Sequence, residues 1–207
     1  MILEFLTLLS LGLIVGLSGA VIPGPLFAFT VFDASRKKAV TGPRIILGHA
    51  MWETLVILII LLGFGALITQ NTLIIYIIGG TALVLMGASM IRSKGREMSM
   101  HNSRTNSSLA GGIFYTAFNP TQPLWWATAG LALLLTGLET MGIIGVLTVT
   151  AGHWLSDLGY YCFVSFMVHR HEKYLNPHHR LITTVLGGFM AVLGSYFLIN
   201  TLKQLVL

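Results

Sequence analysis

Two acidic residues lie inside apolar stretches of this sequence, and each follows a histidine by four positions. Glu53 follows His49 and opens a run without any charge that continues to Ile68. Asp157 follows His153 in the same arrangement 104 positions later, and a glycine precedes each histidine. An acid at the centre of a bilayer costs about 2.5–3.5 kcal/mol, so it is rarely kept there without a partner or a task. We therefore expect both acids to be functional.

The spacing within each pair predicts which chemistry the groups can do together. Residues four apart are neighbours on one face of a helix, so each histidine lies beside its own acid. Paired imidazoles and carboxylates transfer protons, which predicts a proton relay made of His49, Glu53, His153 and Asp157. If the two faces meet, the same groups have the nitrogen and oxygen ligands that bind zinc or manganese. A structural hydrogen bond between helices is the third interpretation.

Prolines interrupt two of the apolar stretches. Pro23-Gly24-Pro25 breaks the first, and Asn119-Pro120-Thr121-Gln122-Pro123 breaks a later one. Proline removes a backbone donor, and in hydrocarbon a broken backbone is tolerated where it lines a cavity, although a simple kink is the alternative. Together with the two acids, these breaks predict a substrate site made of Pro23, Gly24, Pro25, Glu53, Asn119, Pro120, Gln122 and Asp157.

The elements that must position these residues are membrane helices. Of the 207 residues, 55% are hydrophobic and only 9% are charged, against about 25% charged in a soluble domain. The mean hydropathy is +0.81. We predict an all-α membrane protein with six transmembrane helices, at 5–32, 44–68, 72–92, 109–136, 141–168 and 181–202.

Basic residues gather in alternate loops between these predicted helices. Eleven of the twelve lie there, namely Arg36, Lys37, Lys38, Arg44, Arg92, Lys94, Arg96, Arg104, Arg170, Lys173 and Arg180, and only Lys203 falls on the other side. The positive-inside rule then predicts a multi-pass protein of the cytoplasmic membrane with both termini outside. The net charge of +5 is thereby explained without a nucleic-acid partner.

A polar segment divides the chain near its middle. Residues 93–108 are rich in Ser, Asn, Arg and Gly, which is typical of a linker, here on the cytoplasmic side. It separates a half at 1–92 from a half at 109–207. The breaks, the histidine–acid pairs and the glycine pairs Gly79-Gly80 and Gly187-Gly188 recur in the same order in both halves. Three helices per half predict two inverted repeats, with helices one and four broken.

Enzymatic signatures are missing from the sequence. It contains no His-Glu-x-x-His motif, no nucleophile elbow and no phosphate-binding loop. The single cysteine, Cys162, cannot form an internal disulfide or a dithiol relay. We therefore expect a transporter without a cofactor, driven by a proton or sodium gradient.

The motifs resemble those of a known family. Pro23-Gly24-Pro25, the helix with an acid five residues after Gly48, and Asn119-Pro120 look like the LysE/RhtB family of amino-acid exporters, over essentially the whole chain. The chain departs from that pattern with Glu53 in place of an aspartate, with Gln122-Pro123-Leu124-Trp125-Trp126 in place of aliphatic residues, and with its two histidines. At the superfamily level the resemblance extends to metal exporters.

The resemblance implies secondary export of amino acids or close analogues. The proline breaks would receive the substrate carboxylate, and Glu53 and Asp157 would bind the ammonium group or exchange a proton for it. The alternative is export of a divalent metal cation bound by His49, Glu53, His153 and Asp157. The glycine-rich helix faces are compatible with a homodimer.

Overall fold

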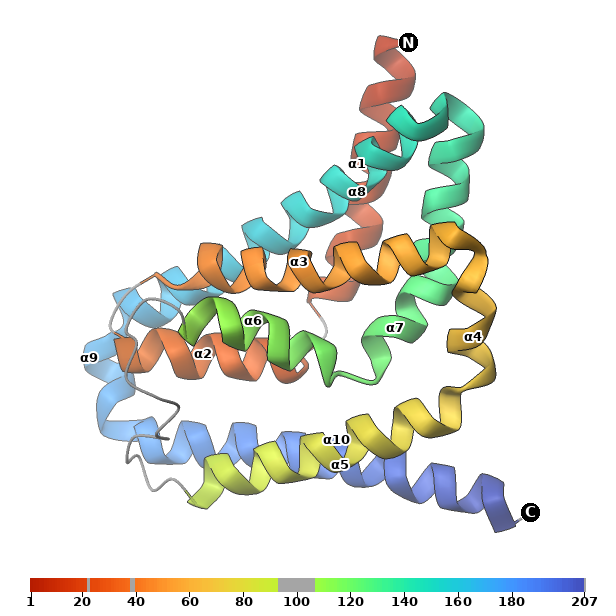
Figure 1. Cartoon of the computed structure of the whole chain (residues 1–207). Coiled ribbons are helices and arrows are strands. Elements are labelled where there is room, and N and C mark those ends of the chain that lie inside the picture. The colour runs from red at the N-terminus through yellow and green to blue at the C-terminus, as the bar shows by residue number, and fades with distance from the viewer. Residues whose placement is uncertain (22, 38–39, 93–106, 207) are drawn as a thin grey trace.

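The structure, a computed structural model, describes residues 1–21, 23–37, 40–92 and 107–206, and in these ranges it is helical without any strand. The helices are α1 (Ile2–Ala20), α2 (Pro25–Lys37), α3 (Gly42–Ile59), η1 (Ile60–Phe64), α4 (Gly65–Gln70), α5 (Thr72–Arg92), α6 (Ser107–Ala117), α7 (Thr121–Trp125), η2 (Trp126–Gly130), α8 (Leu131–Arg170), α9 (Glu172–Leu175), η3 (Asn176–His178) and α10 (His179–Val206) (Figure 1). Most of the predicted linker, 93–106, lies outside the described residues, and its last two positions begin α6.

The chain is broken at both places where the prolines predict a break. Helix α1 ends at Ala20 and α2 begins at Pro25, and proline is well tolerated in a first helical turn because its missing N–H would have no partner there. Helix α6 ends at Ala117, and Asn119 then accepts hydrogen bonds from the backbone N–H of Thr121 at 3.2 Å and from its hydroxyl at 2.8 Å. These bonds start the next helix in a new direction.

Five segments of the described chain, and not the predicted six, are long and apolar enough to cross a membrane. They are Ile2–Ala20, Gly42–Leu67, Thr72–Arg92, Thr121–Arg170 and Arg180–Lys203. The breaks leave α2 with 13 residues and α6 with 11, which is short of the roughly 20 that a crossing needs. The 50-residue segment bends at Gly142, which has a φ of 60°, so α8 consists of two arms.

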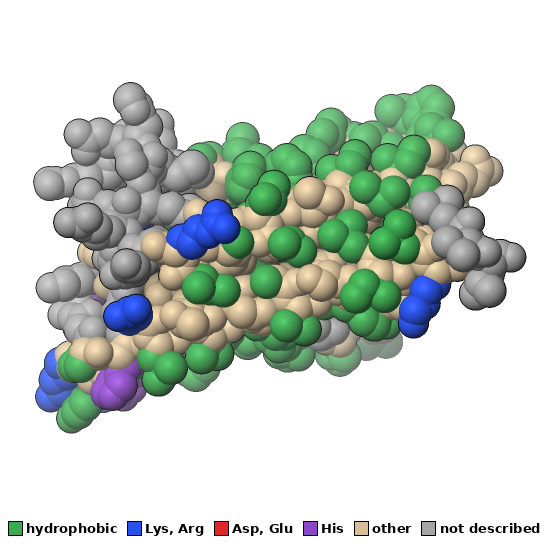
Figure 2. Space-filling model, turned by 90° about the horizontal axis from the view of Figure 1, so that it is seen from below, with side chains coloured by type: hydrophobic (Ala, Val, Ile, Leu, Met, Phe, Trp, Pro, Cys, Tyr) green, Lys and Arg blue, Asp and Glu red, His purple; other side chains and the backbone are tan. Residues whose placement is uncertain are grey.

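The outer surface has the character of a lipid-facing one. Helices α5 and α10 lie side by side along the lower edge of Figure 1. Seen from below, Figure 2 shows hydrophobic side chains along this face, with Lys and Arg near its two ends. Ile78 on α5 and Val192 on α10, for example, are 55% and 70% exposed. Such an apolar face is stable in lipid, which supports an integral membrane protein.

Glycines set the closest helix crossings. Where α3 crosses α6, a Cβ atom on Gly48 would collide with the backbone at Leu109, and one on Gly112 with the backbone at Ile45. Where α1 crosses α8, Gly12 and Gly152 pack against each other in the same way. These contacts join parts of the chain that are far apart in sequence, and they bring the histidine-bearing turns of α3 and α8 into the interior.

Candidate functional site

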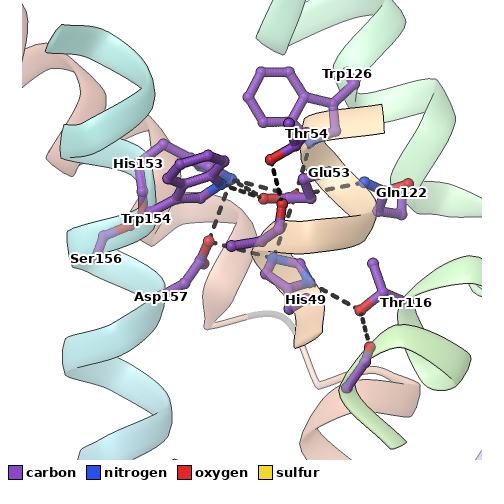
Figure 3. A network of polar contacts seen from close by, with 12 residues as sticks. His49, Glu53, Thr54, Thr116, Gln122, Trp126, His153, Trp154, Ser156 and Asp157 are labelled. Atoms are coloured by element: carbon purple, nitrogen blue, oxygen red, sulfur yellow. Dashed lines mark hydrogen bonds and ion pairs between the residues drawn. The ribbon is translucent and has the colours of Figure 1, made fainter. Parts of the chain in front are cut away.

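Helix α3 and the second arm of α8 each contribute one histidine–acid pair to a shared polar network (Figure 3). Glu53 and Asp157 are only 2% and 3% exposed, and both histidines are buried. His49 Nε2 lies 3.2 Å from Glu53 Oε1 and 3.4 Å from Asp157 Oδ2. His153 Nε2 lies 3.2 Å from Glu53 Oε2 and 3.2 Å from Asp157 Oδ2. Imidazole nitrogens and carboxylate groups thus alternate around a closed ring of four side chains, which we call the four-residue ring.

Glu53 is also held from two other segments. The indole N–H of Trp126 in η2 donates to Oε1 at 2.7 Å, and that of Trp154 in α8 donates to Oε2 at 2.9 Å. The amide of Gln122 lies within 3.4 Å of Oε1. A buried carboxylate is tolerated only when donors replace the water it has lost, and indole N–H groups do so here. The two tryptophans therefore fix the direction of this carboxylate.

The orientation of the His49 ring follows from a neighbouring hydroxyl. Thr116 in α6 donates its only proton to the carbonyl of Gly112 at 2.6 Å. Its oxygen, 2.9 Å from His49 Nδ1, must then accept a hydrogen bond from that nitrogen. His49 therefore carries a proton on Nδ1 and turns Nε2 toward the two carboxylates.

His153 is positioned by aromatic rings. Its imidazole stacks on Trp125 with ring centroids 4.9 Å apart and meets Trp126 edge-on at 5.0 Å. Its Nδ1 faces α1, where a methyl group on Gly16 would come within 2.8 Å of that nitrogen. In the described part of the chain Nδ1 has no hydrogen-bond partner. Nε2 is consequently the nitrogen that takes part in the four-residue ring.

A cavity of about 690 Å³ opens beside the four-residue ring. This volume is within the range of about 300–1,000 Å³ that is usual for small-molecule sites. All four ring residues reach its wall, and aromatic side chains form much of the remainder, namely Tyr76, Trp125, Tyr161 and Phe189. The arrangement can therefore hold a small molecule with a charged end against the ring and an apolar part against the aromatic wall.

The predicted site residues come together with one exception. Pro23, Gly24, Pro25, Glu53, Asn119, Gln122 and Asp157 all line the cavity. Pro120 is not part of its wall, because it packs against Gly79 of α5, where a Cβ atom would lie 2.8 Å from the proline ring. Whether these residues bind substrate stays a prediction.

Sequence reasoning missed three of the contacts that organise the site. Thr116 and Trp154 were not singled out, and no polar role was predicted for Trp126. A signal existed for the tryptophans: a buried indole N–H needs an acceptor, and few side-chain acceptors are available inside apolar helices. Thr116 had no such signal, because a helical threonine usually bonds its own backbone.

A third buried acid, Asp33, lies away from the four-residue ring. Asp33 at the end of α2 is 6% exposed, pairs with Lys37 at 3.1 Å and accepts a hydrogen bond from Ser108 at 2.7 Å. Lys37 lies four positions after Asp33, so the two side chains are neighbours on one face of α2. Its partners neutralise it locally, so it belongs to the packing of α2 against α6.

A family comparison identifies the chain. The family model described as LysE type translocator matches residues 17–201, which cover most of the sequence and include the four-residue ring and every residue of the cavity wall. No curated protein and no solved structure matches the chain significantly. Because the match extends over most of the length, this membrane protein belongs to the LysE type translocator family, whose members are transporters and not enzymes.

Proposed function

We propose that this translocator exports amino acids or close analogues across the cytoplasmic membrane and that protons drive the export. The observation that carries the proposal is the cavity, where two helix breaks meet the four-residue ring. An amino acid has one negative and one positive end, so its site needs two different environments. The wall of the cavity includes both the residues of the helix breaks and the four-residue ring.

The helix breaks are proposed to receive the carboxylate. Backbone N–H groups in the first turn of a helix have no intrahelical partners and carry a partial positive charge. Helix α2 begins at Pro25, on the cavity wall. A substrate carboxylate at this end of the cavity is answered by backbone dipoles, without a basic side chain. The described residues of the wall include no Lys or Arg.

The substrate ammonium is proposed to meet Glu53 and Asp157, with the histidines as the proton relay. Imidazole and carboxylate groups in contact pass protons between them, and such chains are characteristic of proton-driven transporters. The substrate ammonium and a proton on the four-residue ring neutralise the same negative charge of the carboxylates. Binding of the ammonium group therefore replaces a bound proton. Export of the substrate then alternates with uptake of protons.

Alternating access is proposed to come from two inverted repeats. The support is a pair of matching contacts: Gly48 packs on Leu109, and Gly152 packs on Leu9. The two glycines are 104 positions apart, and the two leucines are 100 positions apart. In the contact of α5 with α10, Gly80 meets Gly194 and Gly87 meets Gly187. An inverted repeat with an offset of about 107 positions relates Gly80 to Gly187 and Gly87 to Gly194, so it relates these two contacts to each other. Two halves related in this way can open the same cavity to either side.

The experiment uses purified protein in vesicles with an imposed pH gradient. Radiolabelled amino acids are supplied as a mixture and then singly, and accumulation is measured with and without the gradient. We expect gradient-dependent accumulation, and we expect Glu53→Gln and Asp157→Asn to reduce it at least tenfold, because each removes a charge from the cavity. The matched control is Glu139→Gln, which changes an exposed carboxylate outside the cavity wall. Full activity of both ring variants would contradict the proposal.

A further inference from the structure

The four-residue ring has a geometry that simple ion pairing does not explain. A charge-assisted N–H···O bond is about 2.7–2.9 Å long and points at one acceptor. In the ring all four nitrogen–oxygen distances lie between 3.2 and 3.4 Å, and each Nε2 is shared between two carboxylates. One N–H cannot point well at both. The ligand atoms of the four side chains are therefore arranged around one common point, and not as separate ion pairs.

These distances match the edges of a metal coordination shell. With zinc–nitrogen bonds of about 2.0–2.1 Å and zinc–oxygen bonds of about 2.0–2.2 Å, a tetrahedron has edges of about 3.3–3.5 Å. If Glu53 contributes Oε1, four of the six edges already have nearly this length, because His153 Nε2 lies 3.4 Å from that oxygen as well. One ligand atom from each residue lies within 4.8 Å of all the others, so small side-chain movements close the remaining two. The cluster thus accommodates one ion.

Supporting contacts around the ring are those that a metal site needs. A ligating imidazole usually donates its other N–H to a fixed acceptor, which orients the ring and is itself important for affinity. Thr116 is that acceptor for His49, at 2.9 Å from Nδ1. The indoles of Trp126 and Trp154 hold the Glu53 carboxylate in the same manner. The ligand atoms are consequently arranged before any ion arrives.

We propose that His49, Glu53, His153 and Asp157 form a binding site for one divalent transition-metal ion of the zinc or cobalt type. Two carboxylates balance the two charges of the ion, which makes the filled site neutral in apolar surroundings. Two nitrogen ligands disfavour Mg²⁺ and Ca²⁺, which prefer oxygen. Because all four residues line the cavity, an ion enters by the same space as a solute.

Cobalt binding to the purified full-length protein in detergent tests the site directly. Co²⁺ in a four-coordinate site of nitrogen and oxygen ligands absorbs visible light far more strongly than Co²⁺ in water. We expect saturation at one ion per chain, displacement by equimolar Zn²⁺, and no displacement by a hundredfold excess of Mg²⁺. Absence of saturable Co²⁺ and Zn²⁺ binding to folded protein would overturn the proposal.

Four variants locate the ion. Asp157→Asn is expected to weaken binding at least a hundredfold. Thr116→Val, which removes only the acceptor for His49, is expected to weaken it 10- to 100-fold, and Thr116→Ser to restore it. His171→Ala changes an exposed histidine whose Nδ1 contacts the Met167 carbonyl, and it is expected to bind Co²⁺ like the unmodified chain. Thermal unfolding followed by circular dichroism verifies that each variant is folded. Binding that survives Asp157→Asn but is lost in His171→Ala would assign the ion to His171 and overturn the proposal.

A bound ion has a consequence that rests on the proposed function. It occupies both carboxylates, so Zn²⁺ should inhibit amino-acid accumulation in vesicles, and Thr116→Val should need 10- to 100-fold more Zn²⁺ for the same inhibition. The two proposals fail separately. Co²⁺ binding without amino-acid transport would leave the metal site standing and remove the amino-acid exporter, whereas transport without any metal binding would do the reverse.

Discussion

Glu53 is the residue on which the polar interior depends. It receives contacts from His49 on its own helix, from Trp126 in η2, and from His153 and Trp154 in α8. A carboxylate buried to 2% exposure would be strongly destabilising if it had lost its water without replacement. The surrounding donors explain how the chain keeps this acid inside an apolar helix.

Replacing one of these donors tests how far transport depends on the direction of the carboxylate. Trp126→Phe keeps the aromatic volume but removes the N–H that reaches Oε1 at 2.7 Å. A hydrogen bond to a charged group contributes about 1.5–3 kcal/mol, so we expect export to fall by about tenfold or more. Initial rates of amino-acid accumulation in vesicles measure the effect.

The control for this change is Trp52→Phe. Trp52 directly precedes Glu53, packs half-buried against the apolar core and is not part of the cavity wall. Its replacement is expected to leave the export rate within about twofold. Equal rates for Trp126→Phe and the unmodified chain would show that the indole bond has no part in transport.

At the scale of helices, glycines decide where the functional turns lie. Gly48 directly precedes His49, and Gly152 directly precedes His153. Each lets a second helix approach until its backbone touches the glycine, α6 in the first case and α1 in the second. The same close approach brings Thr116 to His49 and Gly16 to His153. The repeated glycine–histidine dipeptide therefore couples helix packing to the position of the imidazole.

Adding one methyl group at such a crossing should separate the helices. In Gly48→Ala the new Cβ meets the backbone of α6, and overpacking of this kind typically costs about 1–3 kcal/mol. We expect a lower midpoint of thermal unfolding in detergent and a loss of export, since His49 moves with the helix. Gly159→Ala is the matched control, because nothing lies within 4 Å of its Cβ position.

The control variant should be as stable as the unmodified chain or more stable. Alanine is favoured over glycine in a helix by about 1 kcal/mol, and Gly159 lies in α8. If Gly48→Ala and Gly159→Ala unfold at the same midpoint, the crossing of α3 and α6 has room for a methyl group, which would contradict the close contact at Gly48.

At the scale of the whole molecule, the two halves of the sequence are interleaved. Helix α1 packs on α8, α3 on α6, and α5 on α10, so each of these crossings joins the first half to the second. Neither half can complete the four-residue ring or the cavity by itself, because each contributes one histidine–acid pair. Gly80 and Gly87 of α5 contact Gly194 and Gly187 of α10, so these glycines serve packing within one chain.

The orientation in the membrane is a whole-molecule property that single cysteines can measure. In a Cys162→Ser background, Lys173→Cys and Lys203→Cys place one thiol at each predicted side, and both positions are exposed. The positive-inside rule predicts that a membrane-impermeant maleimide labels position 203 in intact cells and position 173 only after permeabilisation. The opposite pattern would invert the predicted orientation and, with it, the direction of transport.

The sequence by itself determined the features that depend on local composition. Long apolar runs make membrane helices because the bilayer leaves no other way to satisfy the backbone, and the prolines at 23–25 and at 120 interrupt them because they lack a donor. The cost of a buried acid pointed to Glu53 and Asp157, and the four-residue spacing paired each with its histidine. The family resemblance came from the same residues, and the family match confirmed it.

Only the tertiary structure decided how these parts meet. The structure shows that α2 and α6 are too short for a crossing, and that α8 bends at Gly142, where φ is positive. The contacts of Trp126, Trp154 and Thr116 depend on how helices from opposite halves cross. That crossing is set by backbone contact at glycines between segments about a hundred residues apart, and no periodicity within one helix carries this information. The closed ring of four ligand atoms is therefore a property of the packed molecule.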